Sequence, residues 1–289
     1  MDRMRISNGR VLEFLEVGDP RGRPVVYLHG TPGTAGSAAL FEHAARHEGV
    51  RLVAVSRPGY GESTTTVPGL LSGSQDIAEL ANQLEIDTFG VLGVSGGGPF
   101  ALAVGAALPT RVRSIVVAAG PGPYHEIAPD KLAPEDLQAI DLLAAGDVEG
   151  AVAVVSAEVV RDFDPIVRLP ASEFEAAFSA SGPPTEHYFD TRPDDRAVFF
   201  ADLRRALDRY DGFIRDNLSW CGPWDFDLRD VVAPVRLSYG ASDAMGPLVH
   251  GEWLHERLPK ADLTVHPEAG HGEVCFGLAQ WSLSALSED

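Results

Sequence analysis

Residues 93–97 constrain the fold of this chain more than any other segment. They read Gly-Val-Ser-Gly-Gly, with an apolar run typical of a buried strand before them (89–94) and a helical pattern after them (99–108). A serine between two such elements sits on a sharp, strained turn. Glycine flanks it because larger side chains would collide there. The segment therefore predicts a strand–turn–helix unit that holds the Ser95 hydroxyl clear of the sheet.

The backbone beside Ser95 also suits catalysis. The N–H of Gly96 lies at the start of the predicted helix, where unpaired donors and the helix dipole favour negative charge. That is one half of an oxyanion hole. An incidental serine in a glycine-rich loop is an alternative, because the chain has 30 glycines. A phosphate-binding loop would need a Lys-Ser or Lys-Thr pair, which residues 98–100 do not supply.

Strand and helix patterns alternate through residues 1–123. The predicted strands are residues 5–7, 11–17, 25–28, 52–55, 89–94 and 114–118, the first two joined as a hairpin through Asn8 and Gly9. The predicted helices between the later strands are residues 37–47, 75–84 and 99–108. This alternation predicts an α/β fold with a mostly parallel sheet and helices on both of its faces.

Residues 124–225 interrupt this alternation with a helical pattern. The predicted helices are residues 134–145, 147–161, 172–180, 195–209 and 211–218, and the prolines expected to break them are Pro165, Pro170, Pro183, Pro184 and Pro193. The alternation then resumes, with strands at 235–239 and 263–266 and helices at 247–258 and 274–285. We therefore expect a core of residues 1–123 and 226–289 and a helical cap of residues 124–225.

A nucleophilic serine needs a base, and the base needs a carboxylate to orient it. His271 follows the last predicted strand between two glycines, whereas His266 lies within that strand and is more simply a packing residue. Asp243 lies in a loop at the carboxyl end of the sheet, where α/β proteins bind their ligands. Asp262 opens a strand at the opposite edge. The chain order Ser95, Asp243, His271 is the one expected for this turn.

The second oxyanion donor is expected in the loop after the strand at residues 25–28. That loop is residues 29–33, His-Gly-Thr-Pro-Gly. The N–H of Thr31 is the candidate, because Pro32 has none. His29 is expected to be a buried residue that braces the loop.

Composition excludes several classes of partner. The net charge of −19 argues against nucleic acid and anionic membrane surfaces. The longest smooth apolar stretch, residues 101–108, is far short of the about 18 residues that a membrane span needs. Cys221 and Cys275 lack metal-ligand spacing, and two scattered thiols are typical of a reduced intracellular protein. We expect a cytoplasmic protein.

The predicted cap is rich in aromatic and acidic residues. Its aromatic residues can form the cap's own core, and its acidic residues a solvated face. Alternatively, a few aromatic residues face Ser95 as an apolar pocket, since pockets favour domain interfaces. The candidates for substrate binding are Phe163, Phe189, Phe199, Phe213 and Trp220.

Taken together, these motifs resemble the α/β-hydrolase superfamily in its capped form. The resemblance rests on residues 29–32 and 57–63, the turn at Ser95, Gly240 with Asp243, and Gly270 with His271. It implies an eight-stranded, mostly parallel sheet with a lid after the sixth strand, where residues 124–225 fall. The chain departs from the family in having Ser56 before Arg57, where relatives often have an aspartate that braces the loop.

The resemblance implies acyl transfer through an acyl-enzyme on Ser95, with His271 as base and Asp243 as its orienting acid. Thr31 and Gly96 would form the oxyanion hole. No metal or organic cofactor is needed. We expect a small-molecule substrate with an apolar group, a carboxylic ester or lactone, and leave a homodimer open.

Residue types narrow the subfamily. Epoxide hydrolases and haloalkane dehalogenases use aspartate where Ser95 stands, which argues against both. Proline iminopeptidases usually carry tryptophan where Gly96 stands, yet an acidic cap could hold a substrate amine. Carbon–carbon bond hydrolases, cofactor-free perhydrolases or haloperoxidases, and ligand receptors built on this fold remain alternatives.

Overall fold

The chain folds around one large sheet. The computed structural model describes residues 1–7, 9–181 and 188–287. Within these residues, eight strands pair in the order β1-β2-β4-β3-β5-β6-β7-β8. The strands are β1 (Asp2–Arg5), β2 (Val11–Gly18), β3 (Arg23–Leu28), β4 (Val50–Val55), β5 (Phe89–Val94), β6 (Val112–Ala118), β7 (Val235–Gly240) and β8 (Ala261–His266).

The sheet is mostly parallel, as predicted. β1 and β2 form an antiparallel hairpin and β2 pairs antiparallel with β4, while the pairs from β4 to β8 are parallel. The parallel strands in the middle of the sheet are apolar because helices cover both of their faces. Because they are parallel, β5, β7 and β8 all end at the same edge of the sheet, and this edge carries the candidate site.

Helices of the core cover the two faces of the sheet. Strand residues alternate between the two apolar clusters: Val26 and Leu28 pack on one side, and Val25 and Tyr27 on the other. One side is covered by α2 (Ser74–Gln83), α3 (Gly97–Ala107) and α10 (Leu248–Arg257). The other is covered by a 3₁₀ helix (Ala35–Phe41), α1 (Glu42–His47) and α11 (Ala279–Ala285).

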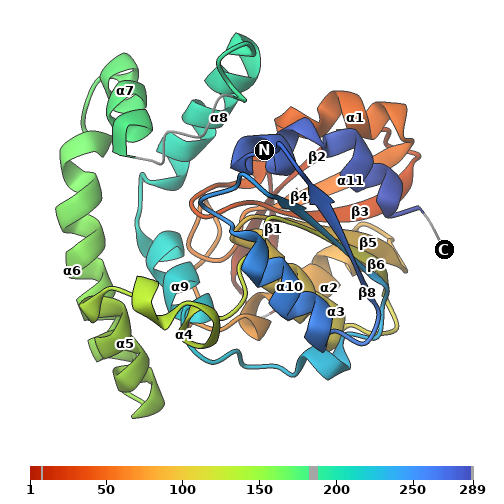
Figure 1. The fold of residues 1–289 in the computed structure, drawn as a ribbon. Coiled ribbons are helices and arrows are strands. Elements are labelled where there is room, and N and C mark those ends of the chain that lie inside the picture. Colours follow the sequence, from red (N-terminus) through yellow and green to blue (C-terminus); the bar gives the residue numbers. More distant parts are fainter. Residues whose placement is uncertain (8, 182–187, 288–289) are drawn as a thin grey trace.

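Between β6 and β7 the chain forms the helical insert. After the short α4 (Tyr124–Ile127), its helices are α5 (Pro134–Ala144), α6 (Val148–Val167), α7 (Ala171–Ser181), α8 (Pro193–Ala206) and α9 (Asp211–Trp220). Figure 1 shows α5, α6 and α7 as an outer column, with α9 between this column and the sheet. The insert is consistent with a cap. Its division from the core at residues 123 and 226 stays a prediction.

Several boundaries differ from the sequence expectation: the first strand is Asp2–Arg5 rather than 5–7, and α8 is Pro193–Ala206 rather than 195–209. Pro165 was expected to break a helix ending at residue 161, but α6 continues through it to Val167. Proline here removes one hydrogen bond close to the helix end, where the helix is about to stop. Pro170 and Pro193 do lie at helix starts, whereas Pro183, Pro184 and Asn8 lie outside the described residues. The predicted helix at 274–285 is instead a π-helical turn (Glu273–Gly277) followed by α11.

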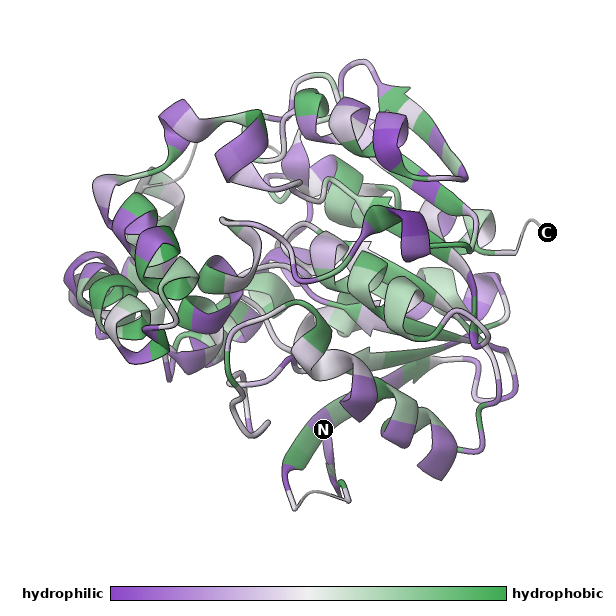
Figure 2. Cartoon of the chain, turned by 90° about the horizontal axis from the view of Figure 1, so that it is seen from below, coloured by the Kyte–Doolittle hydropathy of each residue, from purple (hydrophilic) through white to green (hydrophobic). Residues whose placement is uncertain are grey.

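The hydropathy of the chain follows this architecture. Figure 2 shows the central strands largely green, while helices of the insert alternate between purple and green segments. Such alternation is expected of helices that bury one face and expose the other. In the part of the chain that the structure describes, no helix is both long enough and apolar enough to cross a membrane.

Candidate active site

Ser95 lies on the sharp turn between β5 and α3. Its φ is +50°, a left-handed conformation that is strained for a residue with a Cβ. The neighbouring glycines leave room for this turn. A Cβ added to Gly93 would lie 2.6 Å from the Gly97 carbonyl oxygen and 2.7 Å from the Ala101 Cβ. Local crowding thus explains why glycine occupies this position.

This crowding predicts a stability difference between two glycines of β5. Gly93→Ala should lower the free energy of unfolding by about 1–3 kcal/mol, the usual cost of overpacking. Gly90→Ala is the matched control, because a Cβ there would meet the Leu286 Cδ2 at an ordinary 3.4 Å. Urea unfolding of both variants measures the difference. Equal stability of the two variants would contradict this account of the turn.

The structure brings Ser95, His271 and Asp243 together. The His271 Nε2 lies 2.9 Å from the Ser95 Oγ, and the His271 Nδ1 lies 2.8 Å from an Asp243 carboxylate oxygen. The three side chains come from three different strand ends, at β5, β7 and β8. This arrangement has the geometry in which a serine, its base and an orienting carboxylate act together. The catalytic roles of the three residues stay a proposal.

Asp243 is held in its orientation by the backbone. Its Oδ1 accepts hydrogen bonds from the N–H groups of Met245 and Gly246, at 2.8 and 2.7 Å, which leaves Oδ2 for His271. Burial raises the pKa of Asp243, but the hydrogen bond and charge of His271 and the two N–H donors outweigh it. The net pKa therefore lies below its ordinary value, and Asp243 is a carboxylate at neutral pH.

His271 has a raised pKa. Burial of its ring lowers the pKa, but the neighbouring Cys275 and the hydrogen bond and charge of Asp243 raise it well above its ordinary value of 6.5. Cys275 lies in the π-helical turn that follows the histidine. The carboxylate thus favours the charged imidazolium, the form a general base takes after it accepts a proton.

The loop after β3 lies against the turn that carries Ser95. A Cβ on Gly30 would lie 3.5 Å from the Ser95 Cβ, and a Cβ on Gly96 would lie 3.2 Å from the Thr31 backbone nitrogen. Thr31 and Gly96, the two predicted oxyanion donors, are therefore close neighbours beside Ser95. Whether they bind an oxyanion stays a prediction.

His29 and Glu13 brace the loops around the site. His29 is fully buried, and its Nε2 accepts a hydrogen bond from the Arg57 N–H at 3.1 Å. Ser56 stands where the resemblance leads one to expect an aspartate, and its hydroxyl donates to Glu13 at 2.7 Å. Glu13 also accepts from the Glu62 N–H at 3.2 Å. A carboxylate from β2 thus braces this loop, which sequence reasoning did not anticipate.

The five predicted substrate-binding aromatics fall into three groups. Phe163 and Phe213 pack on each other inside the insert, with ring centroids 5.1 Å apart. Phe189 and Phe199 stack on each other and both contact Phe276, a core residue in the π-helical turn after His271. Trp220 packs on Tyr124, 5.4 Å away. Their part in substrate binding stays a prediction.

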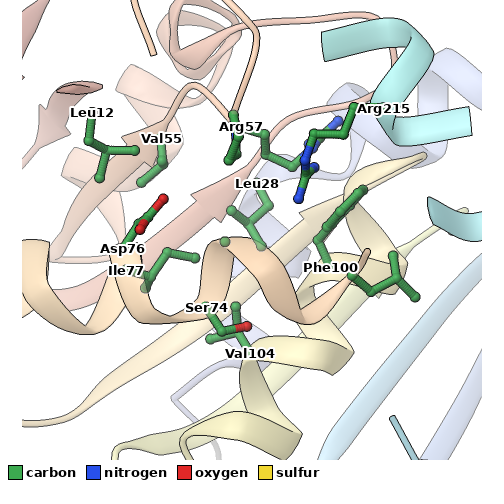
Figure 3. Close-up of a pocket in the computed structure, with 13 residues that line it drawn as sticks. Leu12, Leu28, Val55, Arg57, Ser74, Asp76, Ile77, Phe100, Val104 and Arg215 are labelled. Atoms are coloured by element: carbon green, nitrogen blue, oxygen red, sulfur yellow. The ribbon is translucent and has the colours of Figure 1, made fainter. Parts of the chain in front are cut away.

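A small cavity lies next to Arg57, and Ser95, Asp243 and His271 are not among the residues that line it. Figure 3 shows Arg57, Arg215 and Phe100 on one side of it, with Asp76 and Ile77 on the other. Its volume of about 20 Å³ has room for one water molecule, not for a substrate. Among the described residues, no group of three or more His, Cys, Asp or Glu side chains could hold a metal ion.

Comparisons with known proteins place the chain among its relatives. The family model for the alpha/beta hydrolase fold matches residues 23–272. A proline iminopeptidase from Arabidopsis thaliana is 24% identical over 93% of this chain and 74% of its own length. The dihydrolipoyllysine-residue acetyltransferase component of the acetoin cleaving system from Pseudomonas putida is 34% identical over 91% of this chain. This chain spans 62% of that relative's length, less than two thirds.

The likeness extends to solved structures. An esterase from Exiguobacterium antarcticum superposes with a TM-score of 0.68, covering 99% of this chain and 97% of that one, at 20% identity. At 20% identity this likeness shows the fold alone. The match to the family model covers most of the sequence and therefore shows the family. The chain belongs to the α/β-hydrolase fold family.

Proposed function

We propose that the protein is a serine hydrolase that cleaves a small carboxylic ester or lactone through an acyl-enzyme on Ser95. The observation that carries the proposal is the continuous hydrogen-bonded chain from Ser95 through His271 to Asp243, with distances of 2.9 and 2.8 Å. Such a chain converts a weakly nucleophilic hydroxyl into an effective one, because the base takes its proton during attack.

The first half of the reaction forms the acyl-enzyme. The Ser95 Oγ bonds to the substrate carbonyl carbon as its proton moves to the His271 Nε2, and the carbonyl electrons move to oxygen. The N–H groups of Thr31 and Gly96 stabilise that oxyanion. The bond to the leaving oxygen then breaks, and that oxygen takes the proton from His271. Asp243 keeps the His271 proton on Nδ1 and stabilises the imidazolium.

Water completes the cycle. His271 removes a proton from a water molecule, whose oxygen bonds to the acyl carbon and forms a second tetrahedral intermediate. When this intermediate collapses, the bond to the Ser95 Oγ breaks and that oxygen recovers its proton from His271. A carboxylic acid leaves, and the free enzyme is restored.

The substrate class rests on the surroundings of the site. Phe189, Phe199 and Phe276 form an aromatic cluster that joins the insert to the turn after His271, and an apolar acyl group suits such surroundings. An aminopeptidase of the proline iminopeptidase kind is the second candidate, favoured by the Arabidopsis thaliana relative. Carbon–carbon bond hydrolysis uses the same three residues and is a further alternative.

A substrate panel tests the proposal. We expect p-nitrophenyl esters of short acids and simple lactones to be hydrolysed with kcat/KM values at least about 100-fold above that for proline p-nitroanilide, a difference of about 2.7 kcal/mol in transition-state binding. A fluorophosphonate probe is run beside the panel. The reverse preference would support the aminopeptidase, and labelling without turnover of any panel member would support a ligand receptor.

A further inference from the structure

A buried ion pair links the helical insert to the loop that carries Thr31. Asp216 on α9 has no exposed surface, and Arg57 is 2% exposed. The Arg57 Nε donates to an Asp216 oxygen at 3.2 Å, and the Thr31 hydroxyl donates to the same oxygen at 2.8 Å. The Arg57 Nη2 also donates to the Thr31 Oγ1 at 2.8 Å. The Thr31 side chain is thus held from two sides.

The same arginine holds the peptide group that carries the predicted oxyanion donor. The Arg57 Nη2 donates to the Gly30 carbonyl oxygen at 3.2 Å, and the His29 Nδ1 lies 2.7 Å from that oxygen. Because the His29 Nε2 accepts from the Arg57 N–H, the proton of the neutral ring must be on Nδ1. Burial and the Arg57 charge lower the pKa of His29, which keeps the ring neutral.

Peptide geometry then fixes the direction of the Thr31 N–H. The Gly30–Thr31 peptide is trans and planar, so its carbonyl oxygen and its N–H point in opposite directions. Two buried donors hold the carbonyl oxygen, and the hydroxyl contacts hold the Thr31 side chain. The N–H on the other side of the plane consequently cannot rotate unless these contacts break. The aromatic ring of Phe100 on α3, 4.8 Å from the Arg57 guanidinium carbon, supports the arginine from below.

We propose that Arg57 and Asp216 are positioning residues that orient the Thr31 N–H as an oxyanion donor. The inference rests on the proposed serine-hydrolase function and deepens it. α9 belongs to the insert, so the oxyanion hole is complete when this helix is seated on the core. Correct placement of a preorganised donor matters because a misplacement of about 1 Å can cost on the order of 100-fold in rate.

Thr31 itself offers the mildest test. Thr31→Val keeps the backbone N–H and the side-chain shape but removes the hydroxyl that contacts Asp216 and Arg57. We expect kcat for p-nitrophenyl acetate to fall about 10-fold while KM stays within about threefold. The reason is that the hydroxyl orients the Thr31 N–H, which binds the oxyanion only in the transition state. Thr31→Ser retains the hydroxyl and should restore kcat to within about threefold of wild type. Equal kcat values for the valine and serine variants would overturn the proposal.

Asp216→Asn is the stronger test, and Asp202→Asn is its matched control. Asp202 is a second buried carboxylate of the insert, on α8, and it accepts a hydrogen bond from the Thr34 N–H at 2.9 Å. It ties the insert to the same loop without contacting Thr31 or Arg57. Both variants should lower Tm. We expect a fall in kcat of about 10- to 100-fold for Asp216→Asn, and less than about threefold for Asp202→Asn, because Asp202 contacts none of the groups that hold the Thr31 peptide. Equal losses in both would show that Asp216 merely docks the insert.

A transition-state analogue separates positioning from general damage. A trifluoromethyl ketone forms a hemiketal with a nucleophilic serine and places its oxyanion in the same hole. Its Ki should rise across the variants by the same factor by which kcat/KM falls. An unchanged Ki beside a lowered kcat would overturn the proposal. Asp216 also pairs with the buried Arg215 on the same helix, at 3.4 Å. If Asp216→Asn fails to fold because Arg57 and Arg215 lose their partner, the comparison of Thr31→Val with Thr31→Ser decides alone.

The same experiments distinguish failure of this inference from failure of the proposed function. Loss of turnover in Ser95→Ala together with full activity in Asp216→Asn and Thr31→Val would leave the hydrolase in place and remove the positioning role. Turnover that persists in Ser95→Ala would remove both.

Discussion

Replacing Ser95 by alanine is expected to reduce p-nitrophenyl ester hydrolysis to the background rate. Loss of a serine nucleophile costs on the order of 10⁶-fold in kcat when the serine and its base act as a unit. The substitution removes the Oγ that lies 2.9 Å from the His271 Nε2 and adds nothing to the turn. The expected loss therefore comes from chemistry, not from folding.

Thermal unfolding and a second serine control this prediction. Removal of one hydrogen bond costs about 1 kcal/mol, so Tm should fall by no more than about 2–4 °C. Ser242→Ala is the matched control, because Ser242 is an exposed serine on the loop that carries Asp243. It should keep its activity. Appreciable turnover by Ser95→Ala at an unchanged Tm would refute the nucleophile assignment.

Asp243→Asn is expected to lower kcat by about 10³- to 10⁴-fold. The backbone explains why an isosteric change is so costly. The N–H groups of Met245 and Gly246 select the amide oxygen of the new side chain, so its NH₂ group faces the His271 Nδ1. The histidine must then carry its proton on Nε2, and the wrong tautomer faces Ser95. A ring in this state cannot accept the serine proton.

The control for this change is Asp262→Asn. Asp262 pairs with Arg236 at 2.7 Å, but its side chain is 73% exposed, and such surface pairs contribute about 0–1 kcal/mol. It lies on β8, one residue after the strand begins, and activity should be unaffected. A large loss in Asp262→Asn, with Asp243→Asn fully active, would show that the wrong carboxylate was chosen.

The pH dependence follows from the same contacts. A base must be neutral to act, and the pKa of His271 is raised, so kcat/KM should fall with decreasing pH through a value above 6.5. Asp243→Asn removes one of the charges that raise the pKa and should move this limb to lower pH. A pH–rate profile of both proteins measures the shift. A wild-type rate that stays constant from about pH 5 to 8 would contradict the role of His271 as base.

Local signals made the sharp turn at Ser95 predictable. Glycine at 93 is required by contacts within the turn itself, with Gly97 and Ala101, and these follow from the strand and helix on either side. Glycine at 97 is required by a neighbouring strand, because a Cβ there would collide with the carbonyl oxygen of Leu28 at the end of β3. Asp243 and His271 were predictable because parallel strands end at one edge, so loops far apart in sequence converge. The structure brings Ser95, His271 and Asp243 into hydrogen-bonding contact at this edge.

Long-range contacts without a local signature were not predictable. Arg57 and Asp216 are 159 positions apart, and a charged pair such as Arg215 and Asp216 on a helix is typical of a solvated face. The structure buries it, because α9 packs between the outer insert and the core. Glu13 is a similar case. It lies in β2, next to the edge strand β1, and a glutamate there carries no sequence signal that it braces a loop.

The aromatic residues of the insert illustrate a second limit. Composition shows that the insert is rich in aromatics but not which way each ring faces. Phe163 and Phe213 pair inside the insert, whereas Phe189 and Phe199 contact Phe276, which was not among the candidates. Phe276 lies in a π-helical turn, and the extra residue per turn shifts side-chain directions relative to an α-helix.

Trapping the covalent intermediate tests the central claim most directly. The protein is mixed with a p-nitrophenyl ester, quenched with acid during turnover, digested, and mapped by mass spectrometry. We predict one acyl group on the peptide that contains Ser95, formed at a rate no slower than kcat. Continued turnover with the acyl group on another residue, or with none on any peptide even when deacylation is slowed, would contradict the proposed mechanism.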